Sequence, residues 1–311
     1  MLERIRQGID RTIKCYQNED PVTASKRVTY DAHAETVRLL FERFGDDIGV
    51  PIYERDWEVL IILDACRADL MDEVADEYPF LEPYQYHTSL GSNSGEWMER
   101  NFIEEYSDEM AETAMVTGNP HSKTYLDASD FDILDEVWRY AWEDEEELFE
   151  PKYVTDRAID VKRNEDPDRM IVHYMQPHHP FLPHFDGFES DLHEKWLNQW
   201  RDIRTGHISK GEKWRRYRDN LHYVLDYVEL LLDSIDADPA VISADHGEAV
   251  GEWGIYGHYG IPLHVLRQVP WIETVARNTS EYEPEFAPHS TDVDEARRDV
   301  DDQLEKLGYV R

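Results

Sequence analysis

Five short runs of apolar and β-branched residues along the chain predict strands. The run Val59 to Leu63 is continuous and has charged residues on both sides, which is typical of a strand buried on both faces of a parallel sheet. Similar runs follow at 114–119, 170–175, 240–245 and 269–276. We therefore interpret these segments as the strands of one central sheet.

The segments between these runs have helical spacing of apolar residues. The expected helices cover residues 94–105, 130–149, 153–163 and 213–235. Strands that alternate with helices indicate βαβ units. We therefore expect an α/β fold with a mostly parallel central sheet and helices on both faces.

The two ends of the chain differ from this α/β pattern. Residues 1–17 and 31–44 look helical, and the Pro-Val pair at 21–22 is expected to separate these two helices. The aromatic-rich stretch 184–220 is expected to form a helical cap, inserted into the sheet domain either to face substrate or simply to pack on the sheet. The expected organisation is a helical segment 1–50, a catalytic domain 51–280, and a C-terminal loop and helix 281–311.

The charge of the chain is strongly negative and evenly spread. The 68 Asp and Glu residues outweigh 32 Lys and Arg residues, which gives a formal net charge of −36. Lys is scarce and the acidic residues occur throughout, which indicates a halophilic, archaeal surface adapted to high salt; an ordinary acidic cytosolic protein is the alternative. This charge disfavours nucleic acid and anionic membranes as partners, but a small anionic substrate is compatible with local cations at a site.

Targeting and cysteine signals are weak. The first 17 residues carry charges throughout and have no apolar core, so we expect no signal peptide. No run approaches the roughly 18 apolar residues of a transmembrane helix. Cys15 and Cys66 are too few for a disulfide framework and match no zinc spacing. We expect a cytoplasmic protein without a transmembrane segment, and the oligomeric state is not indicated.

Carboxylates and imidazoles follow several of the expected strands. Asp64 follows the first strand, and Asp245 and His246 follow the fourth. Ligands of open α/β sheets bind beyond the carboxyl ends of the strands, and Asp and His are common ligands of divalent metals. The alternative for a single Asp is a helix N-cap. The metal hypothesis therefore depends on Asp64, Asp245 and His246 occurring together at strand ends.

Two serines are candidates for a nucleophile. Ser92 and Ser94 lie where the segment TSLGSNSGEWMERNF passes from small residues into an expected helix. The positive end of a helix dipole and its free N–H groups favour a nucleophile that faces an anion. The alternative is that Ser94 serves only as the helix N-cap.

Three ordered motifs resemble the alkaline phosphatase superfamily in its sulfatase-like branch. They are LDACRADL at 63–70, HYMQPHHPF at 173–181, and the segment with Asp-His-Gly-Glu at 245–248 and Gly-His at 257–258. The resemblance covers roughly residues 57–275. It implies the α/β fold of that superfamily and a metal-dependent esterase or transferase activity.

The resemblance also implies roles for individual residues. Asp64, Asp245 and His246 would bind a divalent metal, and Ser94 would be the nucleophile, with Ser92 as the alternative. One ion is expected and a second is left open, as is the choice among Mg, Mn, Zn and Ca.

Histidines would complete such a site. His178 or His179 would contact the anionic group of the substrate, and His258 would bind substrate or complete a metal site. A second ion could draw on His258, His178, His173 or Asp226, and His173 could also contact substrate. Arg67 would either screen the anion or pair with Asp69.

The chain departs from the sulfatase pattern in two ways. The motif of Cys or Ser followed by x-Pro-x-Arg is absent, so formylglycine has no residue from which to form. Ala65 replaces the second aspartate that usually follows the first strand. These departures favour a hydrolase or transferase acting on phosphate esters through Ser94. The alternatives are a sulfatase with an unmodified serine, a phosphomutase with two metals, and a degenerate member that only binds.

Overall fold

A seven-stranded mixed sheet forms the centre of the molecule. The computed structural model describes residues 13, 17, 21–44, 49–141, 149–179, 181, 209–279 and 281–286. The strand order is β2-β9-β6-β1-β5-β3-β4. The strands are β1 (Val59–Leu63), β2 (Tyr84–Thr88), β3 (Thr113–Thr117), β4 (Ile133–Glu136), β5 (Arg169–Tyr174), β6 (Ala237–Ser243) and β9 (Gln268–Ala276). A separate hairpin pairs β7 (Ala249–Val250) with β8 (Tyr256–Gly257).

The expected mostly parallel sheet is confirmed. β1 pairs in parallel with β5 and β6, and β3 pairs in parallel with β5 and β4. β9 runs antiparallel to β6 and to β2. All five predicted strands are present, and the carboxyl ends of β1, β5 and β6 therefore lie side by side at one edge of the sheet.

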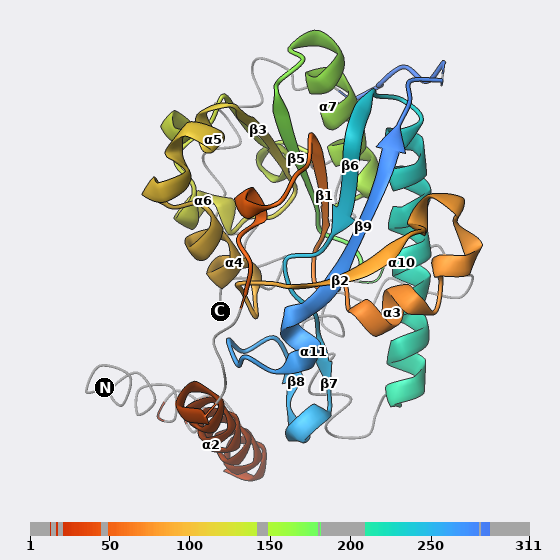
Figure 1. Cartoon of the computed structure of the whole chain (residues 1–311). Helices are drawn as coiled ribbons and strands as arrows, with labels where there is room; N and C mark the ends of the chain where they lie inside the picture. The colour runs from red at the N-terminus through yellow and green to blue at the C-terminus, as the bar shows by residue number, and fades with distance from the viewer. Residues whose placement is uncertain are drawn as a thin grey trace.

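Helices cover both faces of the sheet (Figure 1). Residues of α7 and α10 belong to the larger apolar core on one face, and residues of α4 and α5 to the smaller core on the other. The helices are α2 (Pro21–Phe44), α3 (Ala68–Asp72), α4 (Ser94–Asn101), α5 (Ser107–Ala111), α6 (Ser122–Tyr125), α7 (Pro151–Asn164), α10 (Lys210–Leu232) and α11 (His264–Arg267).

The alternation of side chains along β1 explains why both faces are covered. Val59, Ile61 and Leu63 point into the larger core, whereas Leu60 and Ile62 point into the smaller one. Burial of each such side chain stabilises the fold by about 1.5–3 kcal/mol. A strand that is apolar at every position fits only the interior of a sheet with helices on both sides, so Asp64 is held at a rigid strand end.

Two local expectations are wrong. The helix expected over 130–149 is replaced, where the structure describes it, by the edge strand β4 and a short 3₁₀ turn, Val137–Arg139. β4 pairs with β3 through Ile133 to Glu136 and its side chains are half-buried, so the strand tolerates the charged residues Asp135 and Glu136. The helix expected over 31–44 begins ten residues earlier, at Pro21 of the Pro-Val pair, because proline is well tolerated in the first helical turn.

Three expectations fall mostly outside the described residues. They concern the helix over 1–17, the cap insert over 184–220 and the C-terminal part over 281–311. The end of the expected insert, residues 210–220, forms the first half of α10. Among the described residues, no helix combines the length and the apolar character that spanning a bilayer requires.

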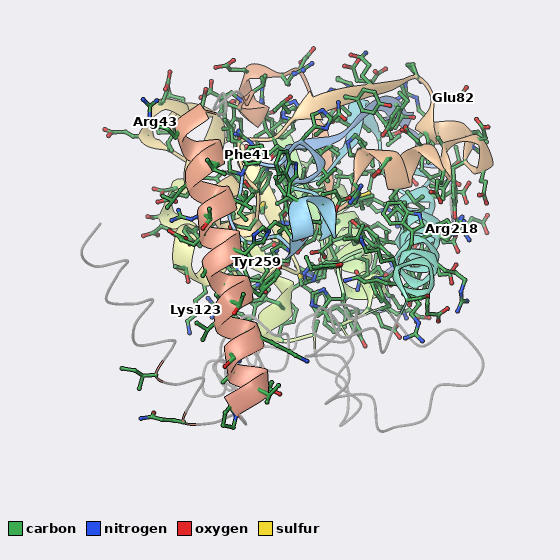
Figure 2. All side chains as sticks on the ribbon, turned by 90° about the horizontal axis from the view of Figure 1, so that it is seen from below. Phe41, Arg43, Glu82, Lys123, Arg218 and Tyr259 are labelled. Carbon is green, nitrogen blue, oxygen red and sulfur yellow. The ribbon has the colours of Figure 1, made fainter. Side chains whose placement is uncertain are left out.

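Helix α2 lies outside the two main layers and packs on the hairpin region. Ala34 and Val37 of α2 are buried in a third apolar cluster with Ile255 and Leu263. Figure 2 shows α2 crossing this side of the molecule, with Tyr259 close to its flank. The segment that precedes the sheet therefore supports the loops that follow β6.

Candidate active site

The strand ends bring the expected metal ligands together. The Nε2 atom of His246 lies 3.4 Å from Asp64 Oδ1 and 3.5 Å from Asp245 Oδ2. His173, on β5, places its Nε2 atom 3.7 Å from the same Asp245 oxygen. All four side chains are buried. The parallel neighbours β5, β1 and β6 thus supply one compact cluster of two carboxylates and two imidazoles.

The backbone orients Asp245. Its Oδ1 atom accepts hydrogen bonds from the amides of Ala65 at 3.0 Å and His246 at 2.8 Å. Ala65 reaches this position with a φ of 59°, in the left-handed region. Burial raises the pKa of Asp245, but its contacts with His246 and His173 and the backbone bond from Ala65 lower it overall. The carboxylate is therefore ionised, with Oδ2 turned toward the cluster.

The ring of His246 is fixed in one tautomer. Its Nδ1–H donates to the carbonyl oxygen of Gly247 at 2.7 Å. A neutral ring then has its lone pair on Nε2, which faces the carboxylates. Burial lowers the pKa of His246, so the neutral form predominates. The side chain is thus prepared to act as a metal ligand.

Ser94 lies against this cluster and is not the helix N-cap. Asn93 caps α4 by accepting a hydrogen bond from the amide of Glu96 at 2.9 Å. The Ser94 hydroxyl lies 3.3 Å from His246 Nε2 and accepts a hydrogen bond from Asn119 Nδ2 at 3.0 Å. The same amide donates to Asp64 Oδ2 at 2.8 Å. The capping alternative for Ser94 is therefore wrong, and its hydroxyl faces the carboxylates.

The donor set fits a divalent ion. Ligand atoms of Asp64, His173 and Asp245 all lie within 4.8 Å of one another. Among the described residues, Asp245 Oδ2 and both ring nitrogens of His173 are buried without a hydrogen-bond partner. Such groups are costly to bury unless something neutralises or binds them. A cation held by these residues would remove that cost.

A second cluster adjoins the first. The hairpin pairs Ala249 with Gly257, and so brings Glu248 and His258, which flank it, together. His258 Nδ1 lies 3.1 Å from Glu248 Oε1. The ring of His258 is 5.0 Å from that of His178 and 4.7 Å from that of His246. His258 therefore lies between the two clusters.

His178 and His179 complete this second cluster. Their ring centroids are 4.0 Å apart, and His179 Nδ1 lies 3.9 Å from Glu248 Oε2. Burial lowers the pKa of His178 and lowers that of His179 to about 3, so both rings are neutral. Burial raises the pKa of Glu248, but its contact with His258 and the nearby Lys213 lower it overall to about 2.

Three predicted residues are placed elsewhere. Arg67 forms a two-pronged ion pair with Asp69, at 2.7 and 2.8 Å, and a second pair with Glu252, so pairing is its observed role. Ser92 is buried, and its amide donates to a side-chain oxygen of Glu96. Asp226 bonds the Tyr78 hydroxyl on the outside of α10 and does not join either cluster.

Sequence reasoning missed three polar residues of this region. Asn119 follows β3, and its side-chain amide donates to Ser94. Glu248 is the fourth residue of the Asp-His-Gly-Glu motif and is buried. Lys213, on α10, is also buried, and burial lowers its pKa to about 7.

Comparisons with known proteins give matches by structure only. No family model and no curated protein matches the chain. It is similar to the soluble domain of lipooligosaccharide phosphoethanolamine transferase A from Neisseria meningitidis, with 14% identity over 71% of this chain and 76% of that one, at a TM-score of 0.47. It is also similar to the C-terminal periplasmic domain of EcEptC from Escherichia coli in complex with zinc. That match has 12% identity over 71% of this chain and 73% of that one, at a TM-score of 0.46.

A third similar structure is described as a protein of the alkaline phosphatase superfamily from Vibrio parahaemolyticus. It has 11% identity over 85% of this chain and 68% of that one, at a TM-score of 0.39. At these identities the likeness concerns the fold.

Proposed function

We propose that this protein is a metal-dependent hydrolase or transferase of phosphate esters, with Ser94 as its nucleophile. The observation that carries the proposal is the position of the Ser94 hydroxyl. It is buried at the start of α4, 3.3 Å from His246 Nε2 and 3.0 Å from Asn119 Nδ2. Two buried carboxylates, Asp64 and Asp245, complete its surroundings. A serine with such neighbours is suited to nucleophilic catalysis.

Asp64, Asp245 and His246 would hold the ion, and His173 offers a further nitrogen. When bound, a divalent ion would polarise the ester and make the serine hydroxyl more acidic. Asn119 fixes the direction of the hydroxyl because it bonds both Ser94 and Asp64. The chain's own contribution is to place the nucleophile and to keep the Asp245 carboxylate ionised.

The transfer follows from these positions. The Ser94 proton passes to solvent, and Oγ forms a bond to phosphorus while the bond to the leaving-group oxygen breaks with its electron pair. His258 is half-buried and hydrogen-bonded to Glu248, so it is placed to give the leaving oxygen a proton. Water or another alcohol then attacks phosphorus and gives its proton to His258, while the bond from phosphorus to Ser94 Oγ breaks and Oγ regains a proton from solvent. With water the outcome is hydrolysis, and with an alcohol it is transfer.

Phosphate is favoured over sulfate. Cys66 is buried, and burial and nearby carboxylates raise the pKa of its thiol, so it is not a candidate nucleophile. Formylglycine chemistry has no matching motif in the chain. A sulfatase that uses unmodified Ser94 is the alternative function, and an ester panel separates the two.

The test compares two neighbouring serines. Purified protein is assayed at molar salt against aryl phosphomonoesters, phosphodiesters and aryl sulfates, with Mg, Mn, Zn and Ca varied. We expect phosphoester turnover that Ser94→Ala abolishes and that Ser92→Ala, the matched control, largely retains. Full activity of Ser94→Ala would overturn the assignment of Ser94 as the nucleophile. Turnover of aryl sulfates alone would favour the sulfatase alternative.

A further inference from the structure

We propose that Arg67 is a positioning residue for His258, the side chain that gives the leaving oxygen its proton in the proposed function. The inference rests on that function and adds the group that fixes its proton donor. Arg67 is buried and follows β1, whereas Glu248 and His258 flank the hairpin β7–β8. One guanidinium thus joins the strand end that carries Asp64 to the hairpin that carries His258.

The Arg67 side chain holds the hairpin at two points. Its Nη1 atom donates to the carbonyl oxygen of Glu248 at 2.7 Å and to Glu252 Oε1 at 2.7 Å. The other carboxylate oxygen of Glu252 accepts a hydrogen bond from the amide of Val250 at 2.7 Å. The first contact fixes the backbone at the open end of the hairpin, and the second fixes the turn between β7 and β8.

The rest of Arg67 is fixed to the sheet domain. Nε and Nη2 donate to the two carboxylate oxygens of Asp69 at 2.8 and 2.7 Å. Trp214, on α10, has its ring centroid 5.0 Å from the guanidinium carbon. The amide of Arg67 donates to the Tyr217 hydroxyl at 3.3 Å, and this hydroxyl donates to the carbonyl of Ala65. The guanidinium is therefore anchored before it reaches the hairpin.

These contacts suit a clamp and not an anion receptor. Asp69 and Glu252 balance the charge of Arg67, and four hydrogen bonds already occupy its three nitrogens. A planar guanidinium holds several partners in fixed directions at once, which a lysine ammonium does not. The arginine therefore fixes a loop that a lysine would leave looser.

Glu248 transmits this order to His258. Its Oε1 atom lies 3.1 Å from His258 Nδ1. An ionised carboxylate only accepts hydrogen bonds, so the proton of this bond belongs to the imidazole. Arg67 holds the Glu248 carbonyl, and the Glu248 carboxylate holds the ring of His258. Loss of the guanidinium should therefore let the ring shift, and a displacement of about 1 Å can lower a rate by roughly 10²-fold.

Leaving groups separate positioning from folding. The phenyl and the p-nitrophenyl ester of the phosphate that the wild type turns over are compared, because p-nitrophenolate departs readily without a proton and phenolate does not. General acid catalysis contributes about 10²–10⁴-fold, so we expect Arg67→Lys to lower kcat roughly 10- to 100-fold for the phenyl ester and about threefold or less for the other.

Two further variants show whether Arg67 acts through His258. In a His258→Ala background, Arg67→Lys should cause no further loss with the phenyl ester, since the two changes remove the same contribution. Arg157→Lys is the matched control. Arg157, on α7, also pairs with two carboxylates, Asp135 and Asp160, but lies outside the hairpin contacts, so both esters should be turned over as in the wild type.

A second measurement needs no substrate. The ring proton between His258 and Glu248 is followed by NMR and assigned by its loss in His258→Gln. We expect slow exchange with solvent in the wild type and in Arg157→Lys, and faster exchange in Arg67→Lys. A protein that behaves in this way but turns over no phosphoester would contradict only the proposed function.

Two results would overturn the clamp. One is an equal loss, or no loss, for the two esters in Arg67→Lys. The other is a ring proton that is unprotected in the wild type or unchanged in Arg67→Lys. Circular dichroism checks the fold of each variant. If Arg67→Lys does not fold, Glu252→Ala removes one of the two hairpin contacts through a partly exposed side chain, and the same two measurements then decide.

Discussion

Asn119 shows how one neutral side chain can organise a charged site. Its amide donates to Ser94 Oγ and to Asp64 Oδ2, so one group fixes both the proposed nucleophile and a proposed ligand. An amide can donate two hydrogen bonds without adding charge. A lysine here would compete with a metal ion for Asp64, which makes the amide the better choice.

Substitution of Asn119 tests this role. We expect Asn119→Ala to lower kcat for phosphoesters by about 10- to 100-fold, the usual effect of losing a group that orients a metal ligand. The affinity for substrate should change little, because Asn119 bonds the nucleophile and a ligand. Steady-state kinetics and the bound-metal content are the measurements. A raised KM with an unchanged kcat would refute the orienting role.

Ala65 accepts backbone strain at the strand end. With φ at 59° it lies in a region that disfavours residues with a Cβ atom, yet its amide bonds Asp245. Ala65→Gly should keep this bond and stabilise the protein by up to about 1 kcal/mol. Ala65→Val should destabilise it, since a β-branched residue tolerates this conformation least. Urea unfolding of both variants measures the difference; equal stabilities would argue against strain.

At the scale of elements, α2 acts as a support for the hairpin β7–β8. The Tyr30 hydroxyl donates to the carbonyl of Tyr256 at 3.1 Å and accepts from the amide of Tyr256 at 2.8 Å. His33 lies 2.8 Å from the carbonyl of Trp253. The hairpin carries Glu248 and His258 at its open end, so contacts with α2 at the other end help to position them.

Removal of the Tyr30 hydroxyl tests this support. We expect Tyr30→Phe to lower stability by about 1–3 kcal/mol, because the amide and carbonyl of Tyr256 lose a partner. Turnover should fall severalfold through the displacement of His258. Thr29→Ala, whose hydroxyl donates to the helix carbonyl of Ser25 at 2.7 Å, is the control. Identical thermal unfolding and kinetics in the two variants would count against a support by α2.

Elements that are buried on both faces could be predicted from the sequence, and edge elements could not. β1, β3, β5 and β6 have apolar runs because helices cover both of their sides, and β9 is buried from Val269 to Ile272. β2 and β4 lie at the two edges, where half the surface meets solvent and polar residues are tolerated. Their composition resembles that of loops or helices, and only pairing with β9 and β3 reveals them as strands.

The candidate site was predictable where residues follow strand ends. Asp64, Asp245 and His246 were found because strand topology alone brings them together. Glu248 was missed because its burial depends on a two-residue hairpin that leaves almost no apolar pattern. Lys213 was missed because a lysine in a charged helix normally faces solvent, and only the packing of α10 buries it.

At the scale of the whole molecule, negative charge is present inside as well as outside. Asp64, Asp245 and Glu248 are three buried carboxylates in a chain with a net charge of −36. Surface charges are screened by salt, whereas buried charges are screened much less. The buried carboxylates therefore require cations or hydrogen-bond donors close to them.

The outer charge leads to a prediction about salt. The Debye length falls from about 10 Å at 0.1 M to about 3 Å at 1 M salt, so repulsion between scattered surface carboxylates weakens. Since about 1 kcal/mol shifts the unfolding midpoint of a domain of this size by roughly 2–4 °C, we expect a rise of several degrees when KCl increases over that interval.

The comparison that isolates charge screening uses sucrose. An excluded, uncharged solute stabilises folded proteins without screening their charges. Thermal unfolding is therefore followed in KCl and in sucrose of equal osmolality, both with chelator present so that metal binding does not contribute. A larger rise in KCl supports a surface adapted to salt. An equal rise in both would mean that solute exclusion alone explains the effect and that the 68 acidic residues do not set the salt requirement of the fold.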